Sequence, residues 1–140
     1  MRFVVDTSVV LKWVVAEQDS QHAQTLVGLP LVAPDLLRPE LANALWKKVV
    51  IRKELTPEQA SRGLERASGA LHLVPATPLA DRALALGLAL LHPIYDCFFL
   101  ALAERLELPL ITADRRFLKR VRASSLVIRI LHLEEWSRDD

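Results

Sequence analysis

Short apolar runs that alternate with longer helical segments constrain the fold of this chain more than any other feature. The first run, Phe3-Val4-Val5, holds two β-branched residues and leads directly into an acid. It predicts a short strand that is buried on both faces, as in parallel sheets. Such strands, alternating with helices, are typical of a parallel sheet covered on both faces. We therefore expect an α/β fold, a three-layer α/β/α sandwich with a central, mainly parallel sheet, formed as a single domain over residues 1–140.

The order of the expected elements follows from the remaining runs. Thr7 and Ser8 are suited to cap the first helix, and Thr56 forms a capping box with Gln59. The tail from Leu133 onward is expected to be a short surface segment. The expected strands are Phe3–Val5, Leu31–Ala33, Leu71–Val74, Leu110–Thr112 and Val127–Ile130. The expected helices are Val9–Ala16, Gln21–Gly28, Leu36–Glu54, Pro57–Gly69, Thr77–Leu91, Ile94–Leu106 and Arg115–Val121.

Composition excludes several classes of protein. The formal net charge is +1 and the pI is about 8.0, so no strong overall field recruits nucleic acid and any basic surface must be local. Cys97 is the only cysteine, which excludes an intrachain disulfide and a cysteine-based zinc site and fits a reducing cytoplasm. No signal peptide is visible, and the apolar stretches 84–91 and 97–103 are too short to cross a bilayer. We expect a soluble, cytoplasmic protein with no membrane partner.

Four acidic residues fall where the expected fold would bring them to one edge of the sheet. Asp6 and Asp114 each follow a predicted strand, and the carboxyl ends of parallel strands share an edge. Glu40 and Asp96 lie in the first turns of helices that start at that edge. Each acid alone could cap a helix or complement its dipole. Together, four like charges would raise one another's pKa values unless a cation lay between them, and oxygen ligands suit Mg²⁺ or Mn²⁺.

Hydrolysis of phosphodiester bonds is the chemistry that needs this arrangement. A divalent cation bound by carboxylates can lower the pKa of a water molecule and hold a phosphate group. A basic run begins directly after Asp114, and it fits either a solvated helix face or a set of phosphate contacts. For the second interpretation, the candidate RNA-phosphate contacts are Arg115, Arg116 and Lys119.

Four segments resemble the PIN domain family, specifically the VapC-type ribonuclease toxins of toxin–antitoxin pairs. The resemblance covers essentially the whole chain. It implies a fold with the first strand in the centre of the sheet and an endoribonuclease activity that depends on Mg²⁺ or Mn²⁺. The segments are Phe3-Val4-Val5-Asp6-Thr7-Ser8, Pro39-Glu40-Leu41-Ala42-Asn43-Ala44-Leu45, Tyr95-Asp96-Cys97 with Leu100-Ala101-Leu102-Ala103-Glu104, and Leu110-Ile111-Thr112-Ala113-Asp114-Arg115-Arg116-Phe117.

The resemblance also implies roles for individual residues. Some relatives carry a further acid near the last motif, where this chain has Arg116, so the fourth ligand position falls to Asp114 alone. Asp6 and Asp96 are the expected direct metal ligands, with Glu40 completing the shell partly through water, as Asp114 does. The implied catalytic and metal-binding acids are Asp6, Glu40, Asp96 and Asp114, and the implied supporting residues are Ser8, Asn43 and Thr112.

The partners implied by the resemblance are an RNA substrate, a small antitoxin protein that covers the site, and a second copy of the chain in a homodimer. Trp13 and Trp46 lie on the first and third expected helices, and they are either core residues or line a groove for an antitoxin helix. The main alternative function is a non-catalytic module with the same fold that binds a protein or RNA. An aspartyl-nucleophile phosphatase would need an acid where this chain has Ser8.

Overall fold

The central element of the fold is a five-stranded sheet in which every strand pairing is parallel. The computed structural model describes residues 2–136, and the strand order in this part of the chain is β3-β2-β1-β4-β5. The first strand lies in the centre, as the sequence predicted, and its three side chains are buried. The strands are β1 (Phe3–Val5), β2 (Leu31–Pro34), β3 (His72–Val74), β4 (Leu110–Thr112) and β5 (Ile130–His132).

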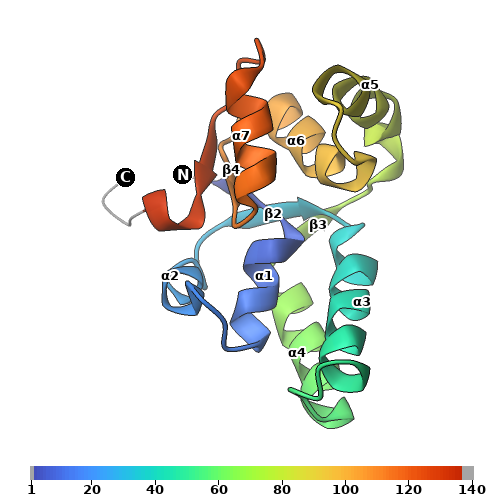
Figure 1. Ribbon diagram of the computed structural model, residues 1–140, viewed down its shortest axis with the longest axis vertical. Coiled ribbons are helices and arrows are strands. Elements are labelled where there is room, and N and C mark those ends of the chain that lie inside the picture. The colour runs from blue at the N-terminus through green and yellow to red at the C-terminus, as the bar shows by residue number, and fades with distance from the viewer. Residues whose placement is uncertain (1, 137–140) are drawn as a thin grey trace.

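Helices cover both faces of this sheet, as Figure 1 shows. The group α1 (Thr7–Val14), α3 (Leu37–Val50) and α4 (Pro57–Gly69) lies on one side, and α5 (Ala80–Leu90) and α6 (Ile94–Leu106) lie on the other. The predicted three-layer α/β/α sandwich is therefore confirmed. The remaining helices are α2 (Ser20–Gln24) beside α1, α7 (Arg115–Ala123) beside β5, and the short 3₁₀ helices η1 (Thr77–Leu79) and η2 (Leu133–Glu135).

The direction in which the sheet grows reverses between β1 and β4. The chain adds β2 and then β3 on one side of β1, crosses back through α5 and α6, and adds β4 and β5 on the other side. The crossing helix α6 packs across β1, β2 and β4, and six of its thirteen residues are buried. Open α/β sheets bind ligands at the carboxyl ends of the strands beside such a reversal. The fold therefore points to the ends of β1 and β4 as the place for a site.

The last strand lies farther along the chain than predicted. It covers Ile130–His132, and the predicted range Val127–Ile130 is wrong, because the side chain of Val127 is fully exposed. The pairing register places the first residue of the strand beside Leu110. His132 is the last residue of the strand. Its polar side chain is buried, and it caps η2.

The segment after β5 is also not the surface segment that the sequence suggested. Leu133 and Trp136 are buried, and the Trp136 ring packs edge-on against Phe3 with their centroids 6.3 Å apart. This segment therefore adds to the core beside the central strand. The last four residues of the predicted tail, 137–140, lie outside the described residues.

Several helices have boundaries that differ from the prediction, and the second helix ends at Gln24, four residues before the predicted Gly28. The first begins at Thr7, because the carboxylate of Asp6 caps it by accepting a hydrogen bond from the amide three residues on. The hydroxyls of Thr7 and Ser8 are therefore not its caps, and they turn to other partners. The third helix ends before the predicted Glu54, because Lys53 adopts a left-handed conformation with φ of 54°.

No single helix within residues 2–136 is long and apolar enough to cross a membrane. The segment Thr77–Leu90 and α6 together have the length and apolar composition of such a helix, but they are bent by 113° relative to each other.

Candidate metal centre

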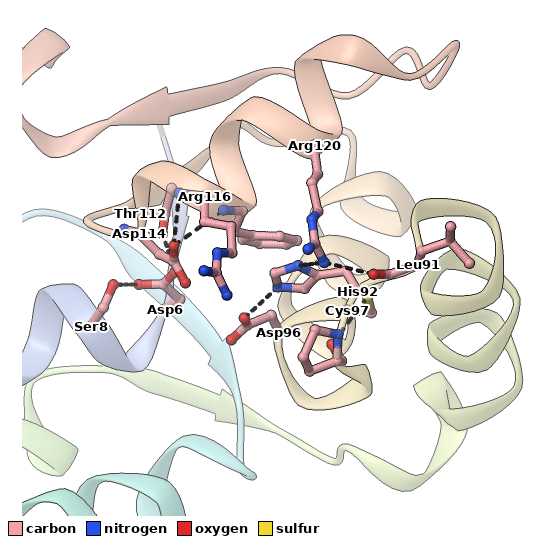
Figure 2. A network of polar contacts seen from close by, with 12 residues as sticks. Asp6, Ser8, Leu91, His92, Asp96, Cys97, Thr112, Asp114, Arg116 and Arg120 are labelled. Atoms are coloured by element: carbon pink, nitrogen blue, oxygen red, sulfur yellow. Dashed lines mark hydrogen bonds and ion pairs between the residues drawn. The ribbon is translucent and has the colours of Figure 1, made fainter.

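Polar side chains gather where the carboxyl ends of β1 and β4 meet (Figure 2). Asp6 follows β1, Thr112 is the last residue of β4, and Asp114 comes two residues later. The Thr112 hydroxyl donates a hydrogen bond to a carboxylate oxygen of Asp6 and accepts one from the backbone amide of Asp114 at 3.0 Å. One hydroxyl therefore holds the two acids in a fixed relation to each other.

Asp6 is the most deeply buried acid at this edge, with 3% of its surface exposed. Its carboxylate accepts hydrogen bonds from the hydroxyls of Ser8 and Thr112 and from the amide of Val9. Burial raises the pKa of Asp6 to about 7, although these hydrogen bonds lower it, and the charge of Asp96 raises it further. Without a nearby cation, the charged form of this carboxylate is therefore disfavoured.

Glu40 reaches the same place from the first turn of α3. The hydroxyl of Thr7 donates a hydrogen bond to its Oε1 at 2.8 Å. Burial raises the pKa of Glu40, the hydrogen bond from Thr7 lowers it, and the charge of Asp96 raises it. The sequence suggested Thr7 only as a helix cap, whereas the structure shows that it orients an acid of the site.

Asp96 and Asp114 lie at the first turns of α6 and α7. Asp114 caps α7, because its Oδ1 accepts hydrogen bonds from the amides of Arg116 and Phe117 at 3.0 and 3.1 Å. Ligand atoms of Asp96, Asp114 and His92 lie within 4.8 Å of one another. Thr112 links Asp6 to Asp114, and the charge of Asp96 raises the pKa values of Asp6 and Glu40, so the four predicted carboxylates lie at the same edge of the sheet. We call Asp6, Glu40, Asp96 and Asp114 the acidic cluster.

His92 is the residue of this site that the sequence analysis missed. It is buried at the corner before α6, and its Nε2 lies 2.7 Å from Oδ2 of Asp96. The signal in the sequence was its position four residues before Asp96, with Pro93 between them. A search for pairs of histidines at ligand spacing does not detect a histidine whose partner is an acid.

The predicted supporting residues lie in different environments. Ser8 donates a hydrogen bond to Asp6 and accepts one from the amide of Ala113 at 3.1 Å, so it joins α1 to the loop after β4. Thr112 makes the two contacts described above. Asn43 lies one turn after Glu40 with its side chain exposed, and that side chain has no hydrogen bond within the described residues. A supporting role for Asn43 stays a prediction.

The basic side chains of α7 fall into paired and unpaired groups. Arg115 forms an ion pair with Glu134 at 2.7 Å. For Arg116 and Lys119, no ion pair occurs in the part of the chain that the structure describes, and both side chains are exposed. Figure 2 shows the Arg116 side chain directed toward the acidic cluster. Of the three predicted phosphate contacts, Arg116 and Lys119 are therefore available for that role, whereas Arg115 already has a partner.

The side chains of the acidic cluster fit a hard divalent cation. They supply only carboxylate oxygens, which are the ligands that Mg²⁺ and Mn²⁺ prefer. A positive charge there would favour the charged forms of Asp6 and Glu40, which the protein alone disfavours. Among the described residues, the ligand atoms that group with Asp96 come from His92 and Asp114 and not from Cys97, and burial raises the pKa of the Cys97 thiol to about 11. The identity of the ion, and the role of each acid toward it, stay predictions.

Comparison of the sequence with known protein families supports the site that the geometry indicates. The model of the PIN domain matches residues 3–123, a range that includes the whole acidic cluster. The chain therefore belongs to the PIN domain family, as the four motifs indicated.

Several known proteins resemble the chain over most of its length. Ribonuclease VapC3 of Pyrobaculum aerophilum is 33% identical over 125 residues, which cover 86% of this chain and 95% of that protein. The crystal structure of PAE2754 from Pyrobaculum aerophilum matches with a TM-score of 0.72 and 24% identity, over 96% of this chain and 94% of that one. A DNA-bound VapBC complex from Salmonella typhimurium matches with a TM-score of 0.66 and 18% identity, over 95% and 98% of the two chains. These two structural likenesses confirm the fold.

Proposed function

We propose that this chain is a metal-dependent endoribonuclease and the toxin of a toxin–antitoxin pair. The observation that carries this proposal is the convergence of four carboxylates, from four separate segments, at the switch point of a PIN fold. The similarity to a relative named Ribonuclease VapC3 supports RNA as the substrate. The bonds to be hydrolysed are the phosphodiester bonds of RNA.

Asp6 and Asp96 would bind the ion directly, and Glu40 and Asp114 would complete its shell, partly through water. When bound, Mg²⁺ or Mn²⁺ supplies a water of lowered pKa and neutralises charge on the phosphate. The protein's own contribution is to hold the carboxylates in place. The Asp6 carboxylate is oriented by two hydroxyls, the Glu40 carboxylate by Thr7, and the Asp114 carboxylate by two amides of α7.

Arg116 and Lys119 would bind phosphate groups of the RNA on either side of the cleaved bond. Both lie on α7, which begins directly after Asp114, and neither has an ion-pair partner among residues 2–136. The guanidinium of arginine can form two parallel hydrogen bonds with a phosphate. The near-neutral net charge of the chain makes such local contacts the main electrostatic attraction for RNA.

RNA cleavage by the purified protein tests this function. The wild type is assayed with Mg²⁺ or Mn²⁺ and with EDTA, beside Asp6→Asn and the matched control Asp81→Asn, which changes an exposed acid of α5. We expect cleavage only with metal, loss of at least about a hundredfold in Asp6→Asn, and no change in Asp81→Asn. Cleavage by Asp6→Asn at the wild-type rate would show that the site is wrongly assigned. If the wild type cleaves no RNA but its melting temperature rises with Mn²⁺, the ion binds and a substrate other than RNA must be sought.

The partner that we propose for the α3–α4 surface is the apolar segment of an antitoxin. Trp46 is 54% exposed there, and with Val50 and Leu64 it lines a groove of about 370 Å³. Trp13 is partly buried against the core, its Nε1 donates to the carbonyl of Ala23 at 2.8 Å, and it lines a separate pocket of about 680 Å³. Coexpression of a candidate antitoxin with the wild type and with Trp46→Ala, followed by mass measurement, tests this: the variant should remain folded and lose the complex.

The homodimer is also part of this proposal. Leu84, Leu88 and Leu91 are 51%, 67% and 81% exposed, and they follow one stripe of α5 and its end, near the exposed Tyr95. A second copy of the chain is the occupant that we propose for this stripe. Light scattering at micromolar concentration should give twice the chain mass of 15.7 kDa, and Leu88→Glu should reduce it to one chain. A wild-type mass of one chain would contradict the dimer.

A further inference from the structure

A buried histidine links α7 to one of the proposed metal ligands (Figure 2). The ring of His92 is stacked on Phe117, with centroids 4.6 Å apart and an angle of 24° between the planes. Its Nε2 lies 2.7 Å from Oδ2 of Asp96, and its Nδ1 lies 3.2 Å from a guanidinium nitrogen of Arg120. The ring is therefore held by a contact on its face and by one contact at each nitrogen.

The contact with Arg120 determines which ring nitrogen carries the proton. A guanidinium offers only N–H donors, so Nδ1 of His92 must accept and cannot carry a hydrogen. In the neutral ring the proton then lies on Nε2, and this N–H donates to the carboxylate of Asp96.

Arg120 is itself fixed at this corner. The same guanidinium nitrogen donates to the carbonyl of Leu91 at 2.6 Å, where α5 ends in a left-handed residue. Arg120 and Phe117 lie one turn apart on α7, and the helix begins at its cap, Asp114. A single helix therefore carries one acid of the cluster and the two side chains that hold His92.

We propose that His92 is a positioning residue for the metal centre, held by Arg120 as the tautomer that donates to Asp96. This inference rests on the proposed function, because Asp96 is there a direct metal ligand. The N–H of His92 occupies Oδ2 of Asp96, which leaves Oδ1 for the ion and fixes the orientation of the carboxylate. A partner of this kind orients the ligand and raises metal affinity without contacting the metal.

The same geometry distinguishes this role from that of a ligand. Histidine binds a metal through the lone pair of an unprotonated nitrogen. In His92 the nitrogen that faces the acidic cluster carries the proton, and the nitrogen with the lone pair faces Arg120. The imidazole therefore stands beside the ion site and does not supply a bond to it.

The protonated nitrogen can be identified directly by NMR of the histidine ring nitrogens. The wild-type protein is examined without metal and with saturating Mg²⁺, which is diamagnetic. We expect the proton of His92 on Nε2 in both states. Arg120→Met, which keeps an unbranched apolar stem but removes the guanidinium donor, should let both tautomers appear. The matched control Arg122→Met, on the same helix but paired with Glu135, should leave the His92 spectrum unchanged. Loss of the Nε2 proton on addition of Mg²⁺ would make His92 a ligand and overturn the proposal.

Metal affinity gives the second test, and it needs no RNA. Mn²⁺ binding is measured by calorimetry for the wild type, His92→Phe and His92→Gln. The phenylalanine keeps the stacking on Phe117 without either nitrogen, and we expect affinity to fall about ten- to hundredfold. The glutamine offers an amide N–H to Asp96 and should restore most of the affinity. A melting curve of each metal-free variant shows whether it is folded, and if His92→Phe is not, Arg120→Met is used in its place, with a smaller loss expected.

The outcomes separate this inference from the proposed function. Equal Mn²⁺ affinity in the wild type and His92→Phe would overturn the positioning role alone. A wild type that does not bind Mn²⁺ would overturn both the metal centre and the inference drawn from it. Metal binding that depends on His92, in a protein that cleaves no RNA, would support the positioning role and count against the ribonuclease.

Discussion

The hydroxyl of Thr112 donates a hydrogen bond to the carboxylate of Asp6 across the boundary between β4 and β1. The two residues are 106 positions apart in the sequence. Because the same oxygen accepts from the amide of Asp114, this one atom connects two acids of the cluster. Its removal should therefore affect the site more than its small size suggests.

Thr112→Val should weaken the metal centre while the fold is retained. The variant has the shape of threonine but loses the donor to Asp6 and the acceptor for the Asp114 amide. We expect Mn²⁺ affinity to fall about ten- to hundredfold and the free energy of unfolding to fall by about 1–3 kcal/mol, because a part-buried amide loses its partner. Calorimetry and denaturant unfolding measure the two effects. Thr112→Ser keeps the hydroxyl and should retain most of both properties, and an equal loss in Thr112→Ser would contradict this account.

The metal-free protein should lose stability as the pH rises toward 7. Burial raises the pKa of Asp6 from 3.8 to about 7, so between these values the folded state binds more protons than the unfolded state. The contribution of Asp6 is then fully present below pH 4 and is lost as the pH rises through 7. Melting temperatures of the metal-free wild type and Asp6→Asn across this range test the sign, and the decline should be smaller in the variant.

Added metal should reverse this trend. A divalent cation binds the charged forms of Asp6 and Glu40, so Mn²⁺ should raise the melting temperature more at pH 8 than at pH 5. The control is Asp6→Asn, in which the increase at pH 8 should be much smaller. An equal increase at both pH values would show that the ion does not bind at these carboxylates.

Arg116→Ala should weaken RNA binding more than Arg115→Ala. Arg115 is engaged with Glu134, whereas Arg116 points toward the acidic cluster without an ion-pair partner in the described residues. Binding of RNA is measured at several salt concentrations, with Asp6→Asn as the background so that the RNA is not cut. Arg116→Ala should reduce the salt dependence by about one unit of slope. The same slope in both arginine variants would rule out a distinct role for Arg116.

Gly87→Ala should disturb the corner that carries His92. A Cβ at this position would lie 2.3 Å from Cδ1 of Ile94 and 3.0 Å from the carbonyl oxygen of His92. We expect a loss of about 1–3 kcal/mol in the free energy of unfolding and weaker Mn²⁺ binding. Gly69→Ala is the matched control, because no atom lies within 4 Å of its added Cβ. That variant should be neutral or slightly more stable, since alanine favours the helix.

Features that depend on neighbouring residues could be predicted from the sequence. The run Phe3–Val5 gave the central strand, and the capping box of Thr56 and Gln59 forms as expected. The convergence of the four acids also followed from local patterns, because a parallel sheet brings the ends of its strands to one edge.

Features that depend on distant partners could not be predicted. His92 is held by Arg120 and Phe117, which come from a helix more than twenty positions later. Arg115 has the positive charge of a phosphate contact, but its guanidinium forms an ion pair with Glu134 in the segment after β5. That segment was itself misjudged, because Trp136 packs against Phe3 at the other end of the described chain.

The long separation between Asp6 and Thr112 has a consequence for how the protein is made. During synthesis the first strand leaves the ribosome early, but the residues that complete the acidic cluster leave it near the end. A partly synthesised chain therefore holds Asp6 without the partners that orient it, and contacts between such distant positions form late in folding. We expect that a growing chain cannot cut the messenger from which it is being translated, and that activity begins only when the last strands have joined the sheet.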